Sequence, residues 1–109
     1  MWTVAQLGSE LAAGRTSSRA LVEQALERIA APAGEGARAF IALDAEGARA
    51  QADAADRLRK AGVTRSPVDG LPVSLQDLFD VAGEVTRAGS KVFEKRAAQD
   101  APAVARLRA

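Results

Sequence analysis

The segment that decides the fold is Asp69-Gly70-Leu71-Pro72-Val73-Ser74-Leu75-Gln76-Asp77-Leu78-Phe79-Asp80-Val81-Ala82-Gly83-Glu84-Val85-Thr86-Arg87-Ala88-Gly89-Ser90. It follows a turn-forming stretch, and its residues 71–75 are a short apolar run that predicts a β-strand. Residues 79–90 are typical of a loop, with glycines at positions 83 and 89. The spacing of these glycines fits neither a P-loop nor a dinucleotide fingerprint, so we expect them to serve backbone geometry.

Helical periodicity dominates the chain before this segment. Residues 3–14 carry apolar side chains at helical spacing, and Gly14 is a suitable C-terminal stop. Residues 16–18 offer hydroxyl groups that can cap a second helix, which presents one apolar face and ends before Pro32. Residues 39–43 are again a short apolar run, which predicts a buried strand.

A third helix is predicted from about residue 45 to residue 61, with Asp44 as its N-cap. Its surface offers two pairs at i,i+4 spacing in the favoured order, Asp53 with Arg57 and Asp56 with Lys60. A basic cluster, Arg57, Arg59 and Lys60, falls near the end of this helix, where it favours the helix dipole. We interpret that cluster as a solvated face.

The last helix is predicted to start after Asp100 as N-cap, with Pro102 in its first turn. Helices that alternate with short apolar strands indicate the α/β class. We expect residues 1–109 to form one domain portion, in which 1–62 is mainly helical with one short strand. Residues 63–109 are then a strand, a loop and the final helix.

Composition excludes several kinds of function. Of the 109 residues, 48% are hydrophobic, but half of these are alanine, so we expect a small core. Fifteen basic and 14 acidic residues give a net charge of +1, and we expect no nucleic acid and no membrane as partners. The sequence has no Cys and no His, which excludes a Ser-His-Asp or Cys-His site within it. The start of the sequence lacks a basic, apolar leader, so the expected location is cytoplasmic.

Few residues in the chain could carry chemistry by themselves. Ser74 alternates with apolar neighbours and is expected to be a strand hydroxyl. Ser90 and Lys91 are adjacent, and neighbours on an extended chain point to opposite faces, so a turn serine beside a solvated lysine is the preferred interpretation. Asp77 and Asp80 could be paired carboxylates or metal ligands, but we expect no metal and no cofactor.

The 69–90 segment resembles the first conserved block of the amidase-signature hydrolases. Members read roughly Gly-(Ile/Leu)-Pro-(Val/Ile)-x-(Val/Leu)-Lys-Asp-x-x-Asp-x-x-Gly, followed by Thr-x-x-Gly-Ser. The chain matches this block at Gly70, Leu71, Pro72, Val73, Leu75, Asp77, Asp80, Gly83, Thr86, Gly89 and Ser90. Residues 18–29, 39–46 and 100–107 also resemble family segments, which implies the N-terminal helices and first strands of the family's mixed-sheet fold. Gln76 occupies the position of the family's catalytic lysine.

The resemblance implies a specific chemistry. Family members hydrolyse amide C–N bonds of small-molecule amides with a Ser-Ser-Lys triad, in which a neutral lysine amine accepts a proton through a bridging serine. A glutamine amide takes no proton near neutral pH, so Gln76 is predicted to be non-functional as the base. The family's two serines lie in a Gly/Ser-rich segment beyond the part that this sequence resembles. We therefore expect these residues to be an inactive N-terminal fragment of an amidase-like hydrolase, in which Asp77 braces the loop through backbone or a basic group.

Two alternatives stay open. The chain could be a non-catalytic α/β module that associates with itself or a partner, because an unpaired strand edge is a template for another strand. It could also be a small Ala-rich α/β domain whose resemblance to the hydrolases is misleading. The coding sequence beyond Ala109 would separate these possibilities.

Overall fold

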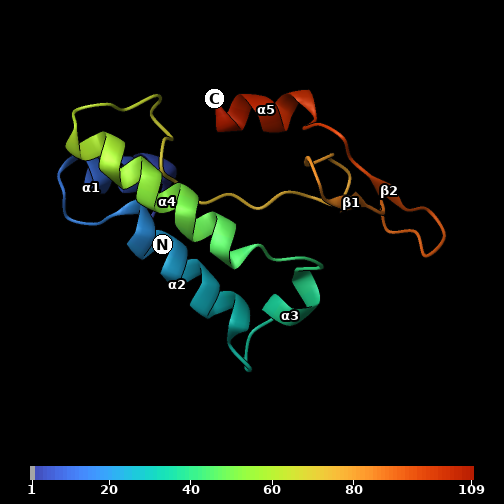
Figure 1. The fold of residues 1–109 in the computed structure, drawn as a ribbon. Helices are drawn as coiled ribbons and strands as arrows, with labels where there is room; N and C mark the ends of the chain where they lie inside the picture. Colours follow the sequence, from blue (N-terminus) through green and yellow to red (C-terminus); the bar gives the residue numbers. More distant parts are fainter. Residues whose placement is uncertain (1) are drawn as a thin grey trace. The chain divides into compact units, whose positions relative to one another are not determined.

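The computed structural model describes residues 2–109, which divide into two compact units (Figure 1). The first unit ends at Val73 and is helical, and the second is Ser74–Ala109. Each unit is described by itself below. Within residues 2–109, no helix is long and apolar enough to cross a membrane.

Helix α1, Val4–Ala12, confirms the prediction for residues 3–14. Thr3 and Gln6 form a capping box, since the Thr3 hydroxyl accepts from the Gln6 N–H (3.1 Å) and the Gln6 side chain accepts from the Thr3 N–H (2.7 Å). The helix ends before Gly14, which has φ +73°. Its Leu11 side chain is buried.

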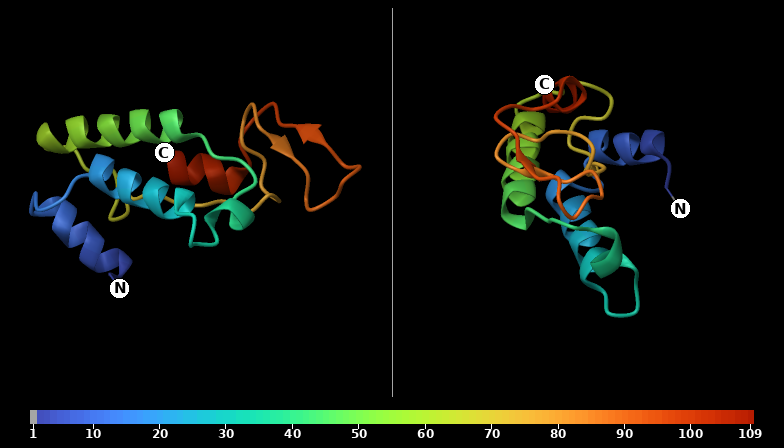
Figure 2. Two further views of the ribbon diagram at one scale, coloured as in Figure 1. Left: turned by 90° about the horizontal axis from the view of Figure 1, so that it is seen from below. Right: turned by 90° about the vertical axis from the view of Figure 1, so that its right-hand side faces the viewer.

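Helices α2, Ser18–Ala30, and α4, Ala45–Lys60, form the main packed pair of the first unit (Figure 2). Both were predicted, and their caps are confirmed at Ser17 and Asp44. Apolar burial is modest: Leu21 and Val22 are buried on α2, and α4 buries only alanines, Ala52 and Ala55. Alanine removes little apolar area from water, so apolar burial alone stabilises this helix pair only modestly, and polar contacts between the two helices can add to its stability.

The predicted strand at residues 39–43 is wrong. Residues Gly36–Ala39 form a short helix, α3, and Phe40 is its C-cap, with its N–H bonded to the Gly36 carbonyl (3.0 Å). Ile41 is 72% exposed. A short apolar run becomes a strand only where another strand pairs with it, and the described residues give this run no such neighbour.

The second unit contains a two-stranded antiparallel sheet, β1 Val85–Thr86 and β2 Lys95–Arg96, with Val85 opposite Arg96. Strand β1 lies inside the stretch predicted to be loop. The predicted strand at residues 71–75 is wrong, because this run has no regular structure and Val73 is 64% exposed. Two backbone bonds, Gly83 N–H to the Ala97 carbonyl and Ala97 N–H to the Glu84 carbonyl (both 2.9 Å), extend the pairing of the sheet.

Helix α5, Pro102–Arg108, confirms the final predicted helix and the place of Pro102 in its first turn. The predicted cap is wrong: Ala101 is the N-cap, and no side chain caps this helix. The Asp100 carboxylate instead accepts from the Ala82 N–H (2.8 Å) and pairs with Arg108 (3.2 Å). It therefore ties the start of the helix to a turn 18 residues earlier in the sequence.

Candidate active-site segment

Gln76 stands at the start of a turn in the second unit. Its backbone carbonyl accepts from the Phe79 N–H (3.2 Å), and the residue is exposed. A primary amide at this place can donate and accept hydrogen bonds, but it cannot act as a base near neutral pH. The turn fixes the backbone on the C-terminal side of position 76.

Asp77 fastens this turn to residues 87–90. Its Oδ1 atom accepts from the Arg87 N–H (3.1 Å), and its backbone carbonyl accepts from the Ala88 N–H (2.9 Å). These contacts agree with the expectation that Asp77 braces the loop through backbone groups. Its Oδ2 atom is buried and has no hydrogen-bond partner within the described part of the chain.

The loop at residues 87–90, to which Asp77 is bonded, has unusual backbone geometry. Ala88 has φ +51° and Gly89 has φ +76°, and the Ser90 N–H bonds to the Arg87 carbonyl (2.9 Å). The Ser90 hydroxyl oxygen accepts from the N–H groups of Val92 (3.1 Å) and Phe93 (3.0 Å). Ser90 therefore has the contacts of a structural turn serine, as its sequence context predicted.

Asp80 is a second fixed point of the segment. Its carboxylate accepts from the Thr86 hydroxyl (2.8 Å) and lies 3.3 Å from Lys95 Nζ, and its backbone carbonyl accepts from the Ala101 N–H (2.8 Å). The Thr86 hydroxyl, followed by the Lys95 ammonium, lowers the pKa of Asp80. Among residues 2–109, no group of three or more His, Cys, Asp or Glu side chains could hold a metal ion. The contacts that Asp77 and Asp80 make are with backbone groups, a hydroxyl and an ammonium group of the same unit.

In the first unit, Arg59 of helix α4 contacts the beginning of the segment, at Asp69. The Arg59 side chain is only 18% exposed, so the prediction of a solvated face is wrong for this member of the basic cluster. Its guanidinium donates to the Asp69 carbonyl (2.7 Å) and to the Ser18 hydroxyl (3.4 Å). Sequence spacing along one helix could not show this, because the partners lie 10 and 41 residues away.

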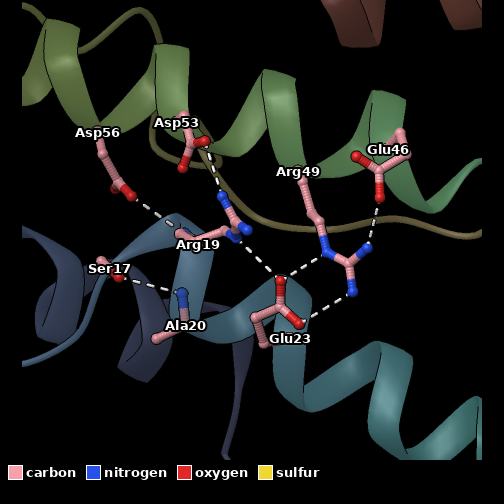
Figure 3. Close-up of polar contacts among 8 residues, drawn as sticks. All are labelled: Ser17, Arg19, Ala20, Glu23, Glu46, Arg49, Asp53 and Asp56. Carbon is pink, nitrogen blue, oxygen red and sulfur yellow. Dashed lines mark hydrogen bonds and ion pairs between the residues drawn. The ribbon is translucent and has the colours of Figure 1, made fainter.

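Helices α2 and α4 are joined by carboxylates and guanidinium groups (Figure 3). The two predicted pairs within α4 are wrong in partner: Asp53 pairs with Arg19 of α2 (2.7 Å), and Asp56 accepts from the backbone N–H groups of Ser18 (2.8 Å) and Arg19 (3.0 Å). These two carboxylates of α4 thus bind groups of helix α2, and not the basic residues of α4 with which they were predicted to pair. Their use across the helix pair supplies contacts that the small apolar interface lacks.

Glu23 is the centre of the same network. It pairs with Arg49 (2.7 Å) and Arg19 (2.9 Å), and Arg49 also pairs with Glu46 (2.7 Å) (Figure 3). Hydrogen bonds from Arg49 and then Arg19 lower the pKa of Glu23 to about 2. This carboxylate therefore stays ionised well below the pH at which an exposed glutamate takes up a proton.

The segment and its supporting helices define an amidase-signature protein of α/β class. The chain belongs to the Amidase family, which matches residues 20–109. A glutamyl-tRNA(Gln) amidotransferase subunit of Roseiflexus castenholzii (strain DSM 13941 / HLO8) is 46% identical over 108 residues, 98% of this chain and 22% of that protein. The AtzE component of 1-carboxybiuret hydrolase from Pseudomonas sp. (strain ADP) is 44% identical over 101 residues, 91% of this chain and 22% of that protein.

A solved structure extends the similarity to the fold. Native peptide amidase from Stenotrophomonas maltophilia matches with a TM-score of 0.85 and 36% identity, over 96% of this chain and 22% of that chain. The sequence therefore spans about a fifth of the length of the relatives that it matches. The resemblance found in residues 69–90 is confirmed at the level of the family.

Proposed function

We propose that these 109 residues are the N-terminal part of an amidase-like domain and do not hydrolyse amides through the family's Ser-Ser-Lys chemistry. The observation that carries the proposal is Gln76, within a segment that otherwise follows the family pattern. Moving a proton from a serine hydroxyl requires a neutral amine or another base within hydrogen-bond reach. A carboxamide has no such capacity, so the proton of the serine hydroxyl would have no acceptor at this position.

The contacts around position 76 support a segment whose backbone is correctly formed and which lacks only the base. Asp77 and Asp80 hold the backbone around position 76 through groups that do not depend on the side chain there. A lysine would keep the same backbone bonds, because Gln76 contributes its carbonyl to the turn. Small-molecule amides remain the proposed substrate class of an intact, lysine-containing form, and we propose the cytoplasm as the location.

Ammonia release from simple primary amides tests the proposal. We expect none above the buffer rate for the unmodified chain, at whatever length its gene encodes. Gln76→Lys is the only change that supplies the family's amine at this position, so gain of activity in that variant supports the assignment of position 76. Activity that is equal with Gln76 and with Gln76→Ala would show that hydrolysis uses another base.

A second function is favoured by a separate observation: the chain is a non-catalytic module that binds a partner or itself. Within residues 2–109 no strand pairs with the apolar run 71–75, and Val73 and Leu75 are exposed. Unpaired backbone beside apolar side chains is a template for an added strand. Sedimentation of the unmodified chain and of Val73→Lys tests self-association, and a stable monomer in both cases would contradict it.

A further inference from the structure

Arg59 joins three parts of the first unit at the point where the family segment begins. Its guanidinium donates to the backbone carbonyl of Asp69 and to the hydroxyl of Ser18, which is fully buried at the start of α2. It also lies 3.6 Å from the Asp56 carboxylate. A charged donor on a backbone carbonyl forms a stronger hydrogen bond than a neutral donor does, and the planar guanidinium fixes direction as well as distance.

The backbone next to this contact requires a glycine at position 70. Gly70 has φ +87°, which disfavours any residue with a side chain. A Cβ atom at this position would collide with the Ser18 hydroxyl and lie 3.0 Å from an Arg59 nitrogen. The glycine is therefore required both by its backbone conformation and by the close approach of the two side chains.

The other side of the turn is held independently. Arg65 donates to the Asp69 carboxylate from its backbone N–H (3.0 Å), Nε (3.2 Å) and a terminal nitrogen (2.7 Å). The Asp69 side chain is thus held within its own loop, whereas its backbone carbonyl is held by helix α4 through Arg59. Of these contacts, the Arg59 bond is the one that connects the turn to a helix.

We propose that Arg59 is a positioning residue for the start of the family segment, residues 69–73. It acts through the Asp69 carbonyl and sets the direction in which these residues leave the helices of the first unit. The inference rests on the proposed function only in identifying residues 69–73 as the start of the segment that contains the family's base position. Arg59 touches no reacting group, and its role is to restrict one turn.

Amide hydrogen exchange in the 109-residue chain tests this role. The reporter is the Leu71 N–H, which bonds to the Val68 carbonyl (3.1 Å), and the reference is the N–H of buried Val22 in α2. Arg59→Ala should accelerate exchange at Leu71 about ten- to a hundredfold relative to Val22, the effect of losing one charge-assisted bond. Arg59→Lys should give an intermediate value, because an ammonium group can still donate one hydrogen bond.

Arg57→Ala is the matched control, since Arg57 is exposed on the same helix. We expect it to leave the ratio of the Leu71 and Val22 rates unchanged. Equal acceleration at both amides in Arg59→Lys would overturn the proposal, because it would mean that Arg59 only stabilises the whole unit. An unchanged ratio in both Arg59 variants would overturn it as well. Activity plays no part in this readout, so its outcome is independent of whether position 76 can support hydrolysis.

Discussion

Asp56→Ala should be among the most damaging single changes to the helical unit. The Asp56 carboxylate accepts from the N–H groups of Ser18 and Arg19, which open helix α2, while Ser17 accepts from the third N–H, of Ala20. A helix leaves its first N–H groups without partners in the helix itself, and here a residue 38 positions away satisfies two of them. Because Ser18 is fully buried, water cannot readily replace the lost acceptor.

The size of the effect follows from these contacts. Each hydrogen bond to a charged group contributes about 1.5–3 kcal/mol, so losing two of them should lower the free energy of unfolding by about 3–6 kcal/mol. This is a large share of the ~5–15 kcal/mol that stabilises a typical domain. Asp56→Asn keeps one acceptor oxygen and should lose about half as much.

Urea unfolding followed by far-UV circular dichroism measures this loss. Asp53→Ala is the matched control, because Asp53 is one turn away and pairs with the Arg19 side chain where both groups are about 40% exposed. An exposed pair contributes about 0–1 kcal/mol, so the control should be nearly as stable as the unmodified chain. Equal losses in Asp56→Ala and Asp53→Ala would refute the cap as the link between α2 and α4.

Three further changes test other parts of the structure. The pKa of Glu23 is lowered to about 2 from 4.5, so its contribution is present above pH 4.5 and is lost as the pH falls toward 2. Glu23→Gln should flatten the acid side of the stability curve in urea titrations, whereas Glu27→Gln, at an exposed site on the same helix, should not. Gly70→Ala should lower the free energy of unfolding by more than ~2 kcal/mol, because the backbone is left-handed there and the new Cβ would collide with the Ser18 hydroxyl. Gly83→Ala, at φ +83° in open space, should lower it by only ~1 kcal/mol. Ala88→Gly should raise the unfolding free energy by ~0.5–1 kcal/mol because φ at this position is +51°, and no gain would contradict a left-handed turn there.

Four of the five helices in the described residues, all except the short α3, could be predicted because their signals are local. Ser17 and Asp44 cap the helices that directly follow them, and Gly14 and Gly62 have positive φ just beyond two helix ends. Periodicity and capping involve residues within a few positions, so the sequence contains all the information needed. The family match could also be found from local sequence, since its motif is continuous along residues 70–90.

What could not be predicted depends on residues distant in sequence. Asp100 was expected to cap the helix beside it, yet it accepts from Ala82, and Asp56 serves the start of α2 instead of Lys60. Arg59 was interpreted as a solvated charge, although it binds the turn before the family segment. The runs at 39–43 and 71–75 have strand composition, but a strand needs a partner, and composition does not reveal whether one is present.

Ammonia production from a primary amide by the purified, unmodified protein tests the central claim most directly. We predict a rate equal to that of buffer, because the carboxamide of Gln76 cannot accept a proton from an attacking hydroxyl. Saturable release of ammonia in proportion to the amount of unmodified protein would contradict the account.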